Sequence, residues 1–361
     1  MSPRRSTAFL LAATALFAAC GSDSGGNGGS AAPNTTAGAV TTDSVPVAEV
    51  EAGKAFPADR CAANKAAGPV IYLSSFDFSA SASIVDVLVA KKNGYYDAMC
   101  LDVQLKPSFS VDNYPQIAAN EAQFSSGGSF SEMVDFADAN DAGYVALAVE
   151  GRTPIDALIT KDGQVPTLAS VKGKKIGVKG AITPAVKAML AKAGLVEGTD
   201  YETVLLDGFD PKVHIEVPDI VGFPGYKSNE PKQLEAAGIP FKLYDPSDDG
   251  IPGSFGIVYT NSTFLSEFPT AAEDFMRATM KGLADAIADP EAAAQVAVDA
   301  IEANKNPLFL SPEGEAARWG VESQLVKDGI APGKPAGLPL VDELTAEVTA
   351  YAAVGLFDGV A

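Results

Sequence analysis

The side chains best suited to covalent or metal chemistry are scarce in this 361-residue sequence, which has three cysteines and one histidine. A protein metal site usually needs three or four such ligands close together. With Cys20 assigned below to another role, His214 and the two remaining cysteines cannot form that cluster. The sequence therefore predicts no metal site.

Cys20 lies at the end of a pattern typical of a secretory signal. Arg4 and Arg5 precede an apolar stretch at 8–19, and two alanines come directly before the cysteine. The stretch is shorter than the roughly 20 residues that a membrane-spanning helix needs. The pattern resembles the bacterial lipobox, in which the cysteine is acylated; an ordinary cleaved signal with an incidental cysteine is the alternative. We expect a signal peptide at 1–19 and an extracytoplasmic protein anchored to the cell membrane through the lipid on Cys20.

Residues 20–55 are rich in Gly, Ser, Ala, Thr and Pro, so they predict a flexible linker after the anchor. Loss of the signal would leave 24 basic and 46 acidic residues. This excess of negative charge makes nucleic acid and anionic lipid surfaces poor partners. The net charge does not identify a ligand, because the electrostatic potential inside a cleft can differ from what the net charge suggests.

Cys61 and Cys100 are the cysteines that remain beyond Cys20. An even pair in an oxidising compartment favours one structural disulfide. Two reduced, buried cysteines are the alternative.

Apolar patterning in the rest of the chain alternates between strands and helices, which predicts an α/β fold built from parallel units. Strands are expected at 69–75, 101–105, 122–125, 143–149, 174–178, 203–206, 219–223, 241–244 and 257–260. Helices are expected at 81–93, 112–119, 129–139 and 183–193, from 230, and at 269–288, 290–304, 312–328 and 341–353. No repeat and no transmembrane segment is evident.

Four segments resemble the solute-binding proteins of bacterial ABC importers. They are NGYYDAMCLDVQL (93–105), AANEAQFSSGG (118–128), LASVKGKKIGVKG (168–180), and the long stretch from SNEPKQLEAAGIPFKLYDPSDDGIPGSFGIVYT to FPTAAEDF within 228–293. The last segment looks closest to the group related to thiamine-pyrimidine synthase, which includes binding proteins for pyrimidine thiamine precursors and for riboflavin. Binders of nitrate, sulfonate and taurine share the first three segments. The loop at 74–79 departs from the tryptophan-proline-asparagine pattern of many pyrimidine binders, which leaves the ligand open.

The resemblance implies a two-lobed periplasmic-binding-protein fold of type II, with the ligand in a cleft that closes by a hinge motion. Lobe 1 would comprise 68–155 plus 258–361, and lobe 2 would comprise 156–257. It implies a monomer without cofactor that passes a small molecule to an ABC transporter permease. The related synthase is an enzyme with a cysteine-rich iron site. Because this chain lacks such a cysteine cluster, we do not expect the protein to be an enzyme. An envelope lipoprotein without a transport role is a further alternative.

Ligands of open α/β sheets lie beyond the carboxyl ends of the strands, which selects the loops at 74–79, 125–129, 180–183 and 223–230. A flat heteroaromatic ligand needs apolar faces and a few directional polar partners. The candidate ligand-binding residues are Phe76, Asp77, Phe78, Ser126, Gly127, Gly128, Ser129, Tyr226, Asn229 and Glu230, with Phe223 as a further aromatic face.

Each candidate also has a structural interpretation. The two phenylalanines of the first loop could be core, Ser126–Ser129 could be only a helix N-cap, and Glu230 could be an acid placed at a helix start. Trp319 and His214 are expected to have packing roles. Because these loops contain aromatics and no arginine, we favour riboflavin or a thiamine pyrimidine over a sulfonate, nitrate or taurine.

Overall fold

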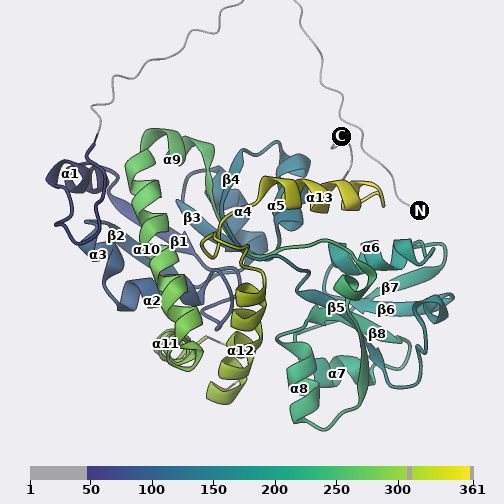
Figure 1. Cartoon of the computed structure of the whole chain (residues 1–361). Helices are drawn as coiled ribbons and strands as arrows, with labels where there is room; N and C mark the ends of the chain where they lie inside the picture. Colours follow the sequence, from purple (N-terminus) through teal and green to yellow (C-terminus); the bar gives the residue numbers. More distant parts are fainter. Residues whose placement is uncertain (1–46, 307–310, 358–361) are drawn as a thin grey trace, which may run out of the picture. The chain divides into compact units, whose positions relative to one another are not determined.

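The computed structural model describes residues 47–306 and 311–357 (Figure 1). The predicted signal peptide, Cys20 and the greater part of the predicted linker lie outside the described residues. No helix in the described ranges is both long and apolar enough to cross a membrane. The chain folds into two β-sheets with helices packed on them, so the predicted two-lobed α/β fold is confirmed.

The first sheet has the strand order β2-β1-β3-β10-β4. Its strands are β1 (Pro69–Leu73), β2 (Asp102–Lys106), β3 (Phe124–Gly127), β4 (Tyr144–Gly151) and β10 (Phe255–Asn261). β1 is parallel to both β2 and β3, whereas β10 runs antiparallel between β3 and β4. All residues of β10 are buried, as expected for a strand enclosed on both edges and both faces.

The second sheet has the order β7-β6-β8-β5-β9 and takes all its strands from one continuous stretch of chain. These are β5 (Asp156–Lys161), β6 (Lys174–Val178), β7 (Tyr201–Leu205), β8 (Gly222–Tyr226) and β9 (Phe241–Tyr244). β6 is parallel to β7 and β8, while β5 is antiparallel to its two neighbours. Both sheets are therefore mixed, and the expectation of parallel units holds only for their βα portions.

The helices begin and end close to the positions that the sequence predicts, with four short helices in addition. They are α1 (Ala58–Ala66), α2 (Val85–Lys92), α3 (Tyr95–Ala98), α4 (Ser110–Ala118), α5 (Phe130–Asn140), α6 (Pro184–Lys192), α7 (Pro211–Glu216), α8 (Glu230–Ala236), α9 (Ser262–Glu267), α10 (Pro269–Ala288), α11 (Pro290–Asn304), α12 (Pro312–Asp328) and α13 (Val341–Ala352). Proline at the first position of α10, α11 and α12 supplies a preset φ where a backbone N–H would have no partner.

Two segments cross between the sheets, one after β4 and one before β10. They lie against each other: a Cβ on Gly253 would be 2.7 Å from Cγ and 2.8 Å from the backbone nitrogen of Pro154. Glycine is required at this position because any side chain would push the two crossings apart. The C-terminal helix α13 also spans the lobes, since it contacts α5 and α6 and places Tyr351 in the apolar cluster of the second sheet.

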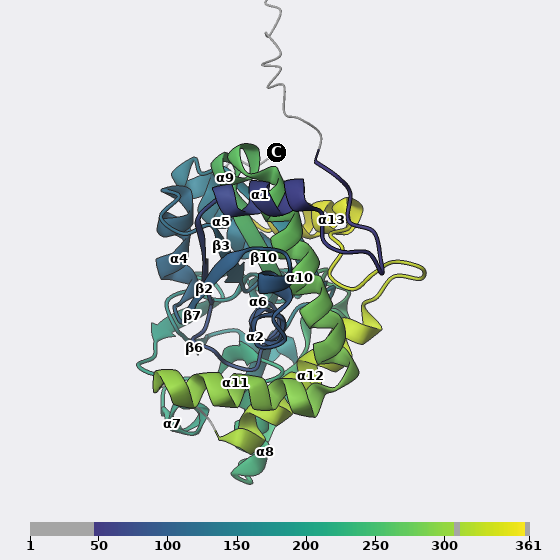
Figure 2. The same ribbon diagram turned by 90° about the vertical axis from the view of Figure 1, so that its left-hand side faces the viewer.

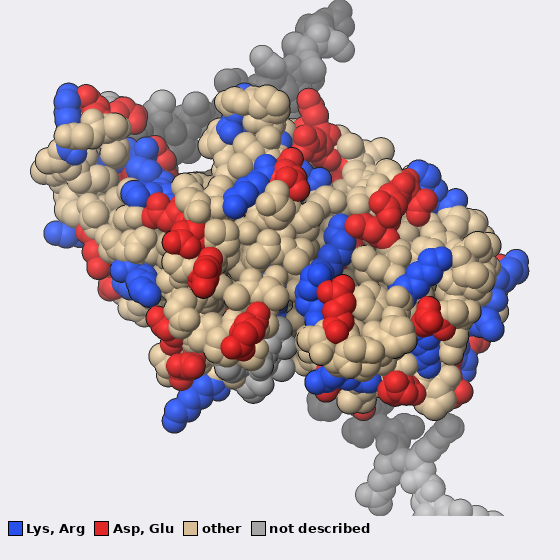
Figure 3. All heavy atoms as spheres, turned by 60° about the horizontal axis from the view of Figure 1, so that its bottom comes forward, with Lys and Arg blue, Asp and Glu red and all other residues tan. Residues whose placement is uncertain are grey.

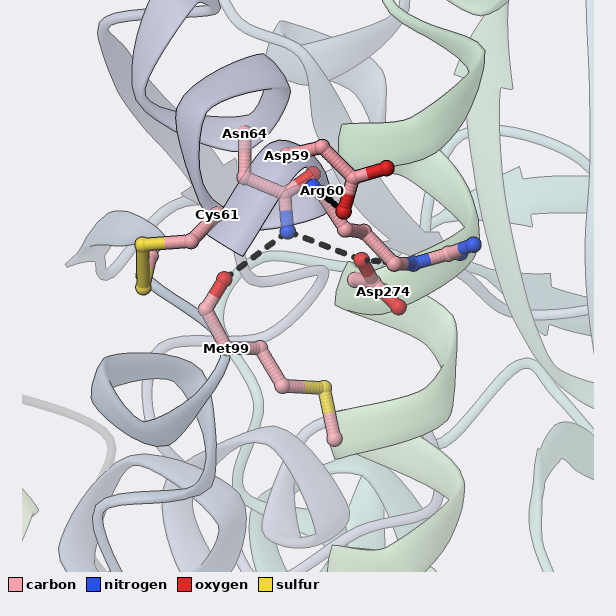
Figure 4. Close-up of a disulfide and its surroundings, with 7 residues drawn as sticks. Asp59, Arg60, Cys61, Asn64, Met99 and Asp274 are labelled. Atoms are coloured by element: carbon pink, nitrogen blue, oxygen red, sulfur yellow. Dashed lines mark hydrogen bonds and ion pairs between the residues drawn. A yellow bond between two sulfur atoms is a disulfide. The ribbon is translucent and has the colours of Figure 1, made fainter. Parts of the chain in front are cut away.

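Helix α1 lies across α10 of the first lobe (Figure 2) and is fastened to this lobe by a disulfide and by a buried ion pair (Figure 4). Cys61 of α1 is bonded to Cys100, with the two Cα atoms 5.3 Å apart. On the same helix, Arg60 Nε donates to Asp274 Oδ2 at 2.7 Å, and both side chains are buried. Asn64 Nδ2 donates to the same carboxylate oxygen at 2.8 Å. Residues 58–66, for which the sequence predicts no helix or strand, thus form a helix that is bonded to α10.

Candidate ligand-binding cavity

A cavity of about 400 Å³ lies between the two sheets. Its walls are loops that follow the carboxyl ends of β1, β2, β3, β6, β7 and β8, the position where ligands of open α/β sheets bind. The volume lies within the range of roughly 300–1,000 Å³ that is usual for small-molecule sites. Helix α12 adds two side chains from the C-terminal third of the chain, Arg318 and Glu322.

Three phenylalanines form the apolar wall of the cavity. Phe76 contacts Phe109 and Phe209 edge to face, with the ring centroids 5.9 Å apart in both pairs. Phe76 and Phe109 follow strands of the first sheet, whereas Phe209 follows β7 of the second, so the wall is completed only when the lobes are together. Phe209 is 45% exposed, which leaves its ring partly free at the cavity.

Glycines at the ends of β3 and β8 leave room for polar side chains that border the cavity. A Cβ on Gly128 would lie 2.8 Å from the hydroxyl of Tyr226, which reaches over from β8. A Cβ on Gly225 would lie 2.9 Å from the carboxyl carbon of Glu230. Any side chain at either position would displace a polar group that borders the cavity.

Lys179 and Glu230 form an ion pair on the second-lobe wall. Lys179 Nζ lies 2.7 Å from Glu230 Oε1, and the ammonium also lies 5.1 Å from the centre of the Phe209 ring. The other carboxylate oxygen of Glu230 accepts the backbone N–H of Tyr226 at 2.8 Å. Glu230 is buried at the first turn of α8, where the helix dipole favours a negative charge.

Arg318 of α12 holds a second ion pair. Its Nη1 donates to both carboxylate oxygens of Glu315, at 3.0 and 2.8 Å, and both side chains are buried. Its Nη2 donates across the lobes to Asn229 Oδ1 at 2.8 Å. The guanidinium carbon also lies 5.9 Å from the centre of the Phe76 ring.

Glu322, one turn further along α12, makes a second connection between the lobes. Its Oε1 accepts from the hydroxyl of Ser228 at 2.6 Å, and its Oε2 accepts from the backbone N–H of Ala82 at the same distance. Burial raises the pKa of this carboxyl above its ordinary value. Arg318 and Glu322 thus bind lobe 2 to lobe 1 directly.

A pair of carboxyls, Asp86 and Glu150, is buried beneath the cavity floor. A Cβ on Gly256, which lines the cavity, would lie 3.2 Å from Cβ of Glu150. Each carboxyl is near enough to affect the ionisation of the other, and both are almost wholly shielded from solvent. Burial raises the pKa of Asp86 to about 6, and burial together with the nearby Asp86 charge raises that of Glu150 well above its ordinary range. Because one ionised carboxylate disfavours ionisation of the other, the pair keeps a proton to a higher pH than the unfolded chain, whose carboxyls ionise near pH 4.

This pair predicts that the protein becomes less stable as the pH rises from about 4 through 6 and beyond. In that window the folded chain binds more protons than the unfolded chain, so the free energy of unfolding falls, by about 1.4 kcal/mol for each unit by which a pKa is raised. Glu150→Gln should flatten the profile above pH 6 because its amide donates to Asp86 without titrating. Urea titrations at several pH values test this, and a slope that both Glu150→Gln and Asp86→Asn leave unchanged would contradict it. The raised pKa of Glu322 contributes with the same sign and is retained in both variants.

The structure brings six of the predicted ligand-binding residues to the cavity and places four elsewhere. Those that line it are Phe76, Gly127, Gly128, Tyr226, Asn229 and Glu230. The remaining four and Phe223 are absent from the lining: Phe78 and Phe223 are core residues, Ser126 accepts the N–H of Ser75, Ser129 caps α5, and Asp77 turns the loop with a φ of 48°. Trp319 and His214 are buried, in keeping with their predicted packing roles.

Several residues of the cavity were not predicted. They are Phe109, Lys179, Phe209, Arg318 and Glu322, among others. Lys179, directly after a predicted strand, could have been found from the strand-end rule; Phe109 and Phe209 also follow strands. Arg318 carries no local signal: it lies on α12, outside the four candidate loops, so the lack of arginine in those loops did not exclude one from the cavity. Within residues 47–306 and 311–357, no group of three histidine, cysteine or acidic side chains is arranged to hold a metal ion.

Comparison with known proteins identifies one matching family and one curated relative. The model of the NMT1/THI5 like family matches residues 81–293, which is more than half of the chain. The riboflavin-binding protein RibY of Chloroflexus aurantiacus is 25% identical over 256 residues, which cover 67% of this chain and 67% of that protein.

Solved structures with the same fold include two sulfonate-binding proteins. The aliphatic sulphonate binding protein SsuA of Escherichia coli aligns with a TM-score of 0.59 and 15% identity, covering 79% of this chain and 86% of its own. The alkanesulfonate-binding protein SsuA of Xanthomonas axonopodis pv. citri, bound to MOPS, aligns with a TM-score of 0.58 and 13% identity, covering 81% and 94%. At these identities the likeness is one of fold.

Proposed function

Because the chain belongs to the NMT1/THI5-like family, we propose that it is the extracytoplasmic solute-binding protein of an ABC importer. The ligand we propose is a flat heteroaromatic molecule of the riboflavin type, held between the lobes. The relative that binds riboflavin supports this choice. The observation that carries it is the wall of Phe76, Phe109 and Phe209, since aromatic rings stack well against a planar ligand and give little to a small anion.

We further propose that the protein is exported by the signal at 1–19 and anchored through the lipid on Cys20, and that it delivers its ligand to a membrane permease. Lobe 1 would comprise 68–155 plus 258–361 and lobe 2 would comprise 156–257, except that the first residues of β10 (Phe255–Asn261) lie in the sheet of lobe 1. The crossings at Pro154 and Gly253 would form the hinge. Closure of these lobes would bury the ligand, and the permease would then bind the closed form.

Binding can be measured with the protein's own tryptophan, because Trp319 is the only one in the chain and sits beside Arg318 on α12. We expect riboflavin to quench Trp319 fluorescence and to raise the melting temperature. Mass spectrometry of ligand retained during purification gives an independent identification. Recovery of taurine or another alkyl sulfonate, with no response to riboflavin, would reject the proposed ligand.

Phe76→Ala should weaken riboflavin binding by about tenfold or more, equivalent to at least ~1.4 kcal/mol. The loss follows from removing a stacking face and the contacts that hold Phe109 and Phe209 in place. Phe268→Ala is a matched control, because Phe268 is a partly buried phenylalanine in a core cluster away from the cavity. Calorimetric titration of both variants tests the prediction; equal affinities in the two would contradict it.

A further inference from the structure

We propose that the cavity selects an uncharged ligand because it neutralises both of its own cations, and that Glu230 and Glu315 set this selectivity. The inference rests on the proposed function, since it concerns the ligand of the same site. It is distinct from the choice of an aromatic ring: flavins occur with and without a phosphate, and the aromatic wall alone cannot distinguish them.

The ionisable side chains that line the cavity are few. Apart from the phenol of Tyr226, they are Lys179, Glu230, Arg318 and Glu322. An anion such as a phosphate or sulfonate would need one of the two cations, or several free backbone N–H groups, as its partner. Among the charged groups of the cavity, the question is whether Lys179 or Arg318 is available to an anion.

Lys179 is committed to Glu230. Their 2.7 Å contact is partly shielded from water, since the side chain of Glu230 is 5% exposed and that of Lys179 is 26% exposed. Glu230 is itself held in place by the N–H of Tyr226 at 2.8 Å, so it cannot turn away without losing that bond as well. An anion that recruited Lys179 would leave Glu230 buried without its cation, which is unfavourable.

Arg318 is committed to Glu315 in the same way, and more completely. The two side chains are 3% and 1% exposed, and the guanidinium donates to both oxygens of the carboxylate. A third N–H, on Nη2, is used by Asn229 of the other lobe at 2.8 Å. A buried, charge-assisted contact of this kind offsets most of the charge of Arg318, so the side chain has little attraction left for an incoming anion.

Glu322 tips the local balance towards negative charge. It lines the cavity with no cation of its own, because its oxygens accept from the Ser228 hydroxyl and the Ala82 N–H. When it is ionised, two cations face three carboxylates in and directly behind the wall. In a site of low dielectric this arrangement repels an anion and tolerates a neutral molecule, a form of specificity by exclusion.

The face of the molecule that Figure 3 shows gives no compensating attraction for an anion. Figure 3 shows one face that includes both lobes, and on it the blue Lys and Arg side chains are interspersed with red Asp and Glu side chains. On this face no broad basic field is present to raise the local concentration of anions.

Riboflavin and its 5′-phosphate are the matched probes, because they share the ring and ribityl chain and differ by one phosphate. We expect the wild-type protein to bind riboflavin at least a hundredfold more tightly than riboflavin 5′-phosphate. Glu230→Gln keeps the size of the side chain and an oxygen for the Tyr226 N–H, but it frees the charge of Lys179. This variant should bind the phosphate at least tenfold more tightly than the wild type, with that gain reduced at high salt.

Glu315→Gln should also raise the affinity for riboflavin 5′-phosphate relative to that for riboflavin, because it frees the charge of Arg318. Glu235→Gln is the matched control, because Glu235 lies on the same helix as Glu230 but its carboxylate is 53% exposed and pairs with Lys232. It should leave both affinities unchanged. Melting temperatures with and without riboflavin check that each variant is folded.

Equal affinity of the wild type for the two flavins, or an unchanged ratio in both Glu230→Gln and Glu315→Gln, would overturn the inference and leave the proposed function intact. A wild-type protein that binds neither flavin would instead reject the proposed ligand. In that case the charge of the molecule that co-purifies with the protein decides: an uncharged one supports exclusion of anions, and a charged one overturns it.

Discussion

Asp274→Ala should lower the free energy of unfolding by about 3–5 kcal/mol, the usual cost of removing one partner of a buried ion pair. Asp274 is fully buried in α10 and accepts from both Arg60 and Asn64 of α1 (Figure 4). Without it, a guanidinium that is 2% exposed loses its buried partner, and an amide loses an acceptor. Urea unfolding followed by circular dichroism measures the loss.

Glu273→Ala is the matched control for this prediction. Glu273 contacts the same guanidinium at 2.6 Å, but its side chain is 52% exposed, so its removal should cost only about 0–1 kcal/mol. Similar costs for the two substitutions would show that burial of the pair is not what makes Asp274 important. Replacing Arg60 and Asp274 together, by methionine and leucine, should recover most of the lost stability, because no charge then remains buried.

Removing the disulfide should cost about 4 kcal/mol, the value expected from chain entropy for a closed loop of this length. Cys61 and Cys100 are separated by 39 positions, and reduction would give that loop back its freedom in the unfolded state. The variant with both cysteines replaced by alanine should therefore unfold at a clearly lower urea concentration than the wild type.

A reducing agent provides the control for the disulfide prediction. It should lower the unfolding midpoint of the wild type to that of the double variant and leave the double variant unchanged. A double variant as stable as the oxidised wild type would mean that the ion pair of Arg60 alone secures α1.

Much of the fold follows from the sequence because apolar periodicity is a local property. The strand at 174–178 and the helices at 269–288, 290–304 and 312–328 were predicted with the bounds that the structure gives. β5 (Asp156–Lys161) was missed because it directly follows the crossing at Pro154. α1 was missed because its polar sequence reads as a continuation of the linker, and tertiary bonds rather than periodicity hold it.

The residues of the cavity were predictable only where they lie in loops that follow the carboxyl ends of strands. That rule selected the loops carrying Phe76, Gly128 and Glu230. It could not decide between Phe76 and Phe78, since the turn at Asp77 sends one ring to the cavity and the other to the core. Nor could it find Arg318, which meets Asn229 across 89 positions of sequence through the packing of α12 against the lobes.

The place of β10 in the first sheet has a consequence for the order of folding. Residues 255–261 fill the gap between β3 and β4, although the whole second sheet, from 156 to 244, is made before them. Because the chain is synthesised from its N-terminus, all strands of the second lobe have been made before the first lobe can complete its sheet. Closure of the first sheet then has to bring together strands separated by about a hundred residues, and such distant pairing is slow. The lobe that begins the chain is therefore the last to become native.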